Sequence, residues 1–468
     1  MSFIGKKRKI ASACLLGSTL SIVSAASAHA TISLLDKDDW KVSMGGFVET
    51  DGIMDSTRSF REVIGNAPVS TSGATGGDGR TQFSIRNSRL AFTLDAPVVD
   101  GWTSKGYLEF DLLGFDPQNT SAAKSSVGAS GANQSESSYF TNPTLRVRHA
   151  FMQAENDGLT VLAGQYWNLL GWQPYYFMSS ADVAPLPGML YSRNPQLRAM
   201  KAVKFSDQDV LQVAAALVRP PQADSRYPSL EAGVRYAMGE RSSGFTGSSS
   251  GSRQAQPMSI ALSGTAREFA IPVAGTTTAS TEHLTGYGLA ADAMIPVLAS
   301  PDGKEVENTL SLLGEYTIGS GDGELLNGWT GGSANPLNAS ANAPSSALNM
   351  DAGIGDYDPN GSFHLMHVQT FNVHAQYHLP SAFLATWVDA GYGQLFSNNM
   401  ASIANSSGQI PGSGSLAYNR EQVIFGNIFH DFTPHVRAAV EYARVQTDYL
   451  QGYSAINNRY QVSAWFLF

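Results

Sequence analysis

Charged residues alternate with apolar residues in the first third of the sequence. Arg146 and Arg148 flank Val147 and follow Leu145, so the two arginines share one side of an extended segment. Successive side chains of a β-strand point to opposite faces, which places both guanidinium groups on one polar face. A guanidinium group presents a planar fork of donors that suits carboxylate and phosphate groups. The spacing therefore indicates a polar surface that attracts anions.

The same alternation places further charged residues on polar faces. Arg89 opposes Leu90 and Phe92, whereas Arg86 would point to the other face unless a bulge or a strand end intervenes. These charged residues either select solutes by charge or pair between neighbouring strands and hold a wall together, and both interpretations stay open. The candidate residues of the polar surface, which would line a pore, are Arg89, Lys105, Glu109, Asp111, Arg146, Arg148 and Arg235.

One long connection, residues 168–195, is rich in aromatic residues and proline. Such a segment either folds into the space that the strands enclose and narrows it, or forms an aromatic belt at a membrane surface or a contact between subunits. Both arrangements stay open. The inward path would bring to a constriction the four candidate residues Asp182, Arg193, Tyr175 and Tyr176.

Patterns for catalysis or metal binding are weak. His374 and His378 share a face of one segment, but they lie about 13 Å apart along a strand, too far for one ion to be bound by both alone. No Gly-rich phosphate-binding loop and no G-x-S-x-G nucleophile elbow occurs in the strand-to-helix setting that each requires. We therefore expect no catalytic residues, no metal site, no cofactor and no enzyme activity.

About sixteen short alternating segments must position these residues. In the last segment, Tyr460, Val462 and Phe466 lie on one face, and Arg459 and Gln461 lie on the other. A tilted membrane strand needs about 9–11 residues, and in a barrel its two faces meet lipid and water. About fifteen segments are clear. A further strand within residues 257–271 makes the number even, so that the first and last strands can pair and leave no open edge.

Short and long connections alternate along the chain, as in outer-membrane barrels with short periplasmic turns and long external loops. A soluble β-sandwich or β-helix would also have short alternating strands, but it would not explain this alternation of connections. The pattern predicts an all-β fold, a transmembrane antiparallel β-barrel. Short turns are expected near residues 97–101, 156–158, 206–209, 296–305, 379–382 and 430–435, and long loops near 55–80, 115–142, 168–195, 319–361 and 397–419.

The N-terminus has the form of a secretion signal. Basic residues at positions 6–9 precede an apolar stretch that ends at Ala28-His29-Ala30, the kind of small-residue site that a signal peptidase cleaves. We expect three parts: a signal peptide at 1–30, a short N-terminal periplasmic segment at 31–40 and the barrel at 41–468. Secretion implies a bacterial cell outer membrane location for such a barrel.

The composition of the chain excludes several classes of partner and structural feature. Cleavage would remove four of the 30 basic residues and none of the 39 acidic ones, so the net charge falls from −9 to −13. A strongly acidic chain is a poor partner for nucleic acid. The one cysteine, Cys14, lies in the signal segment, which leaves no thiol for a disulfide. No stretch of 18 apolar residues follows the signal, so no transmembrane helix is expected.

Five segments together resemble DcaP-like outer-membrane porins: GGFV at 45–48, RNSRLAF at 86–92, GYLEFD at 106–111, LRVRHA at 145–150 and LAGQYW at 162–167. The terminal strand resembles the segment that the assembly machinery of outer-membrane proteins recognises. The resemblance implies a sixteen-stranded trimeric channel with a preference for small anions, since the family's named example is associated with dicarboxylic acid uptake. The family often carries a helical coiled-coil segment before the barrel, whereas only residues 31–40 precede the first strand here.

These observations lead to one expectation and two alternatives. We expect a homotrimeric porin in outer-membrane lipid that lets ions and small hydrophilic solutes diffuse passively, with a preference for small organic anions such as dicarboxylates. The first alternative is a plugged barrel that acts as an adhesin or structural envelope protein. The second is an outer-membrane enzyme barrel.

Overall fold

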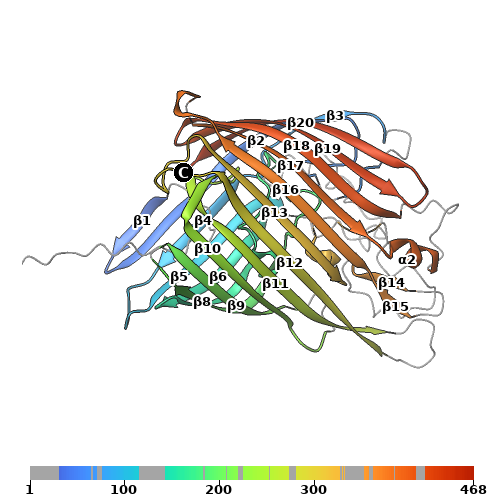
Figure 1. The fold of residues 1–468 in the computed structure, drawn as a ribbon, viewed down its shortest axis with the longest axis horizontal. Coiled ribbons are helices and arrows are strands. Elements are labelled where there is room, and N and C mark those ends of the chain that lie inside the picture. The colour runs from blue at the N-terminus through green and yellow to red at the C-terminus, as the bar shows by residue number, and fades with distance from the viewer. Residues whose placement is uncertain are drawn as a thin grey trace, which may run out of the picture.

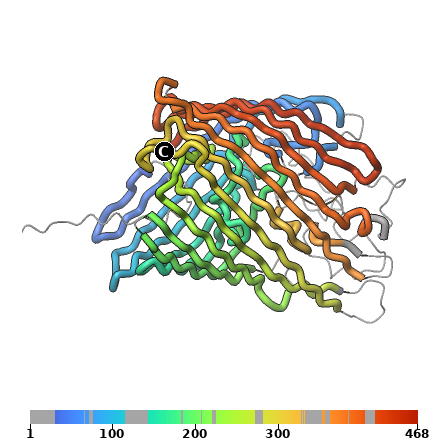
Figure 2. The backbone as a smooth tube through the Cα atoms, in the orientation of Figure 1, coloured from blue at the N-terminus to red at the C-terminus, as the bar shows by residue number. Residues whose placement is uncertain are grey.

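Antiparallel strands close into a 16-stranded barrel, as the alternating pattern predicts. The first wall strand, β2 (Trp40–Asp55), pairs with the last, β20 (Ser454–Leu467), so the ring of wall strands closes on itself. The strands run obliquely around the barrel (Figure 2). The computed structural model describes residues 31–64, 67–70, 76–114, 143–182, 185–206, 208–219, 225–251, 253–272, 281–326, 329, 331, 353–357, 362–383, 385–406 and 417–468.

Each remaining wall strand pairs with its neighbour in the chain (Figure 1). β3 and β4 together form one interrupted wall strand, because both pair with β2. In order, the strands are β3 (Arg80–Ser84), β4 (Arg89–Asp95), β5 (Thr103–Gly114), β6 (Thr144–Asn156), β7 (Leu159–Trp167), β8 (Arg193–Lys204), β9 (Asp209–Val218), β10 (Ser229–Phe245), β11 (Gln254–Pro272), β12 (Thr281–Leu298), β13 (Thr309–Ser320), β16 (His367–His378), β17 (Thr386–Ser397), β18 (Tyr418–Thr433) and β19 (Val436–Tyr449).

Two predicted features, one strand and the positions of the short turns, are confirmed. The strand expected within residues 257–271 is β11, and the short turns lie close to their predicted positions. The segment expected at 31–40 contains β1 (Ile32–Lys37), which forms a hairpin with the start of β2. The long connections carry the small elements η4 (Leu170–Trp172), η5 (Gly323–Leu325), β14 (Gly355–Tyr357), β15 (Phe363–Leu365) and α2 (Met400–Ser406), and η7 (Ser381–Phe383) lies in a short turn. The proposed signal peptide and the loop at 115–142 lie outside the described residues.

The two faces of the wall differ in polarity, as the alternation predicts. On β20, Tyr460 and Val462 are more than half exposed, whereas Arg459 and Gln461, which alternate with them, are buried inside the barrel. The outward face carries large apolar side chains around the whole ring, which suits contact with lipid. Examples from well-separated strands are Val48, Leu108, Val213, Leu230, Leu262, Leu289, Phe371, Ile424 and Val440. In the described part of the chain, no helix is both long and apolar enough to cross a membrane.

An interruption of the wall decides the direction of Arg86. Residues 85–88 leave the sheet between β3 and β4, and Arg86 turns inward there. Its guanidinium group forms an ion pair with Glu62 of the first long loop and donates to the backbone oxygen of Leu112 over 3.1 Å. The sequence analysis allowed for a strand end near Arg86, and this strand end directs the Arg86 side chain into the barrel.

Candidate functional site

The aromatic connection, residues 168–192, crosses the interior of the barrel. At its start, the backbone N–H groups of Leu169 and Leu170 donate to Glu231 of β10. Near its end, Leu190 N–H donates to Glu315 of β13 over 3.3 Å. These carboxylates point inward from different parts of the wall, so the loop is suspended across the lumen. Buried backbone groups need such partners because no water satisfies them there.

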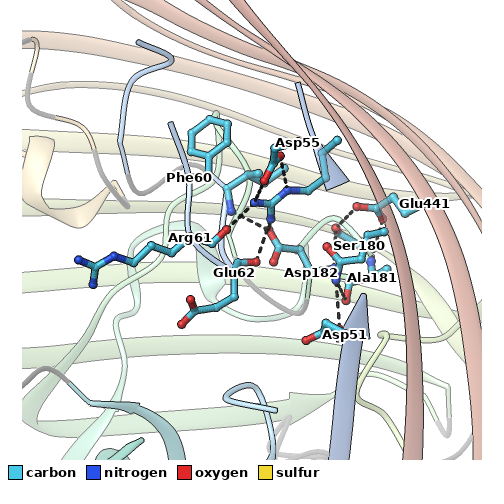
Figure 3. Close-up of polar contacts among 12 residues, drawn as sticks. Asp51, Asp55, Phe60, Arg61, Glu62, Ser180, Ala181, Asp182 and Glu441 are labelled. Atoms are coloured by element: carbon cyan, nitrogen blue, oxygen red, sulfur yellow. Dashed lines mark hydrogen bonds and ion pairs between the residues drawn. The ribbon is translucent and has the colours of Figure 1, made fainter. Parts of the chain in front are cut away.

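The tip of this inner loop is fastened to the opposite wall (Figure 3). Ser180 Oγ and the Ala181 backbone N–H donate to the two carboxylate oxygens of Glu441 on β19, each over 2.7 Å. The next residue, Asp182, accepts from the backbone N–H of Ile64 over 2.8 Å. Its carboxylate also lies 3.6 Å from the guanidinium group of Arg459 on β20. The tip therefore joins two wall strands and the first long loop.

Asp182 thus anchors the loop and does not line the open space of the lumen. Its side chain is fully buried, and burial raises the pKa of this carboxyl group to about 8, although nearby Arg459 acts in the opposite direction. Sequence reasoning placed Asp182 at a constriction. The structure instead buries Asp182 at the loop tip, away from the cavity described below, where its Oδ2 accepts from Ile64 and joins the first loop to the inner loop.

A cavity of about 240 Å³ remains between the inner loop and the wall formed by β4 to β7. Five of the residues selected from the sequence line it: Arg89, Glu109, Arg148, Arg235 and Tyr175. Among the described residues that line this cavity, the three arginines face a single carboxylate, that of Glu109. The cavity therefore has an excess of positive charge, although the whole chain is acidic.

The charged residues of this wall also pair with one another. Arg148 donates from Nε to Glu109 over 2.6 Å and from Nη1 to Asp111 over 2.9 Å. Arg146 forms a two-point contact with Asp111, and Arg89 lies 3.7 Å from Glu109. Pairing between neighbouring strands therefore holds for these residues, and the lining of the cavity still has a net positive charge.

Aromatic rings surround the arginines. The Arg235 guanidinium carbon lies 4.3 Å from the centre of the Tyr175 ring, and the Arg193 carbon lies 4.6 Å from Trp167 and 4.9 Å from Tyr191. Such contacts between a cation and an aromatic face stabilise the charge without neutralising it. They hold the Arg235 guanidinium group at the cavity and that of Arg193 beside it.

Tyr191, which lines the cavity from the inner loop, is a titratable group among these cations. Burial raises the pKa of its phenol, but the guanidinium groups of Arg148 and Arg193, with smaller effects from Arg146 and Arg89, outweigh burial and lower it to about 7. Arg148 Nη2 donates to the Tyr191 oxygen over 3.3 Å. The phenol can therefore lose its proton near neutral pH.

The other selected residues lie nearby but not on the cavity. Tyr176 is buried behind it, where its hydroxyl accepts from Arg235 over 3.2 Å. Arg193 is the first residue of β8 and not part of the loop, and Lys105 lies on β5 closer to the short turns. Arg146 and Asp111 lie beside the cavity and support Arg148.

Sequence reasoning missed one side of the cavity. Ser248, Ser249, Ser250, Gln254 and Gln256, from the connection between β10 and β11 and the start of β11, line the cavity as well. A signal was present: this connection is as rich in Gly and Ser as a long external loop, yet it lies on the side of the short turns.

No family model and no curated protein matches the chain. Among solved structures, the outer-membrane channel DcaP of Acinetobacter baumannii is similar with a TM-score of 0.64 and 16% identity, over 93% of this chain and 100% of that chain. An anion-selective porin from Comamonas acidovorans gives a TM-score of 0.49 at 10% identity, over 92% and 100%. OprB of Pseudomonas putida gives 0.47 at 10% identity, over 91% and 94%. The resemblance to DcaP inferred from short segments is thus confirmed at the level of the fold.

Proposed function

We propose that this chain is a DcaP-like porin of the Gram-negative outer membrane, through which small hydrophilic solutes diffuse passively. One observation carries the proposal: a closed barrel with an apolar outer face holds an inner loop that leaves an arginine-lined cavity against one wall. A barrel in lipid must enclose its polar groups, and a cavity beside a loop tied across the lumen suits a narrowed aqueous path.

The proposed preference is for small organic anions, with dicarboxylates as the first candidates. The net positive charge of Arg89, Arg148 and Arg235 against Glu109 supports it, because charged side chains at a constriction concentrate ions of the opposite sign. The planar fork of an arginine suits a carboxylate in particular. The dicarboxylate itself rests on the family resemblance and not on a measured contact.

The proposed assembly is a homotrimer without enzyme activity or cofactor, and it also rests on the family resemblance. Tight packing of the inner loop would equally suit a plugged adhesin barrel, which would not conduct. An enzyme barrel would hydrolyse lipid after reconstitution. Reconstitution in lipid therefore distinguishes the three classes: a porin conducts, a plugged barrel does not, and an enzyme barrel hydrolyses lipid.

Single-channel recording in a planar bilayer under a salt gradient tests the proposal. We expect steady current in groups of three equal steps, a reversal potential that favours anions, and reduced chloride current when a dicarboxylate is added. A cation-favouring potential would reject the anion preference and leave the porin. Folded protein that gives no current would reject the porin in favour of a plugged barrel.

A further inference from the structure

A second element folds into the lumen from the opposite side to the inner loop. β10 and β11 pair without interruption up to Met238 and Met258, and then residues 239–241 of β10 bulge out of the ladder. Pairing resumes between Ser242 and Pro257 and continues to Phe245 and Gln254. Such a bulge bends a strand. We call the part beyond it, residues 242–257, the inner hairpin; its residue 252 is not described.

The inner hairpin is anchored to wall strands that are not its neighbours. Gly244 N–H donates to Thr309 Oγ1 of β13 over 2.9 Å. Thr246 N–H donates to Gln376 Oε1 of β16 over 2.6 Å, and Gln376 Nε2 donates back to the Thr246 oxygen over 3.0 Å. Thr309 and Gln376 are fully buried on the inner face of the barrel. The hairpin therefore lies across the inside of the wall and not below its rim.

Arg437 of β19 holds the tip of the inner hairpin. Its Nη1 donates to the backbone oxygens of Ser248 and Ser250, each over 2.8 Å, while its Nε donates to Asp431 over 2.6 Å. The guanidinium group is fully buried and lies 4.7 Å from the centre of the Trp387 ring. An arginine fixed on three sides is a rigid support, so the tip is held in one position.

The two inward elements meet each other at the cavity. Ser179 Oγ of the inner loop donates to the Thr246 oxygen of the inner hairpin over 3.1 Å. Beyond this contact, Ser248, Ser249 and Ser250 line the same cavity as Arg89 and Arg148. The cavity thus has a cationic side on the wall and a neutral side, rich in hydroxyl groups, on the hairpin.

We propose that the inner hairpin forms a second wall of the constriction, and that Ser249 at its tip limits the width of the path opposite Arg148. The inference rests on the proposed function, and it adds a specificity-determining element that works beside the inner loop. The hairpin residues that line the cavity are uncharged, so the net positive charge of the path comes from Arg89, Arg148 and Arg235, which outweigh Glu109. A charge placed at Ser249 should therefore change the ion preference directly.

Cysteine labelling of Ser249 tests the inference. Cys14 is the one native cysteine, so a Cys14→Ser background makes Ser249→Cys a single reactive site. Its thiolate would attack a methanethiosulfonate reagent, form a mixed disulfide and release methanesulfinate. The sulfonatoethyl and trimethylammonioethyl reagents add groups of similar size and opposite charge. The matched control is Ser381→Cys, an exposed serine in the short turn between β16 and β17.

We expect both reagents to reduce the single-channel conductance of Ser249→Cys, because each narrows the path. The sulfonate should shift the reversal potential toward cations, and the trimethylammonium group should shift it further toward anions. Mass spectrometry should show that Ser381→Cys is labelled, and neither its conductance nor its reversal potential should change. If the channel conducts and its current does not change after complete labelling at position 249, the inference is overturned and the proposed function is not. A folded wild-type barrel without current would overturn the proposed function and the inference together.

Discussion

Ala181 donates its backbone N–H to Glu441 over 2.7 Å, and the two residues are 260 positions apart in the chain. The same carboxylate accepts from Ser180 Oγ and from Asn427 Nδ2 of β18. One wall side chain thus holds the tip of the inner loop, and with it one border of the cavity. This contact therefore helps to position the inner loop beside the cavity.

Replacing Glu441 with Ala should loosen the tip of the inner loop. The buried donors of Ala181 and Ser180 lose their acceptor, which costs about 1–3 kcal/mol for each donor left unsatisfied. We expect noisier and larger single-channel currents, and unfolding at lower urea concentration in lipid vesicles. Val440→Ala on the outward face is the control. Quiet, wild-type currents from Glu441→Ala would show that the tip is held by other contacts.

Removing the charge of Arg148 should change the ion preference more than removing the charge of Arg146. Arg148 lines the cavity, whereas Arg146 lies beside it and contacts Asp111. We expect Arg148→Gln to move the reversal potential in a potassium chloride gradient toward cations, and Arg146→Gln to move it clearly less. Each variant leaves Asp111 one arginine partner, so both should fold. Equal shifts in the two variants would contradict the assignment of Arg148 to the path.

The ion preference should depend on pH through Tyr191. Its pKa is lowered to about 7 by the surrounding arginines, so the phenol becomes a phenolate as the pH rises through neutrality. The added negative charge offsets part of the positive charge at the cavity. We expect the anion preference to decrease between about pH 6 and pH 8, measured as the reversal potential, and this decrease to vanish in Tyr191→Phe. A wild-type pH profile in Tyr191→Phe would assign the titration to another group.

Stability should depend on pH through Asp182. Burial raises its pKa in the folded barrel to about 8, above the ordinary value of 3.8, so between these values the folded state keeps a proton that the unfolded chain releases. This contribution to the free energy of unfolding is complete below the lower value and is lost as the pH rises through the higher one. We expect Asp182→Asn to reduce the loss of stability between pH 5 and pH 8.5, measured by urea unfolding of vesicle-bound protein. An unchanged pH dependence in Asp182→Asn would count against this assignment.

The sequence by itself determined the strands and their faces. Alternation is a local property, because consecutive side chains of a strand point to opposite sides whatever lies beyond them. The alternation of Arg459 and Gln461 with Tyr460 and Val462 was therefore enough to separate the inner face of β20 from its outer face. The number of strands also followed from the sequence, because an antiparallel barrel in lipid needs an even number of strands to leave no edge unpaired.

Only the tertiary structure decided how the lumen is divided. The path of the inner loop depends on Glu231 and Glu441, which are distant from it in the chain, and the position of the inner hairpin's tip depends on Arg437. Asp182 was selected for a constriction, but the folded chain uses it as an anchor. The physical reason is that buried donors and acceptors take whichever partner the closed barrel brings near, and closure joins residues that no local pattern relates.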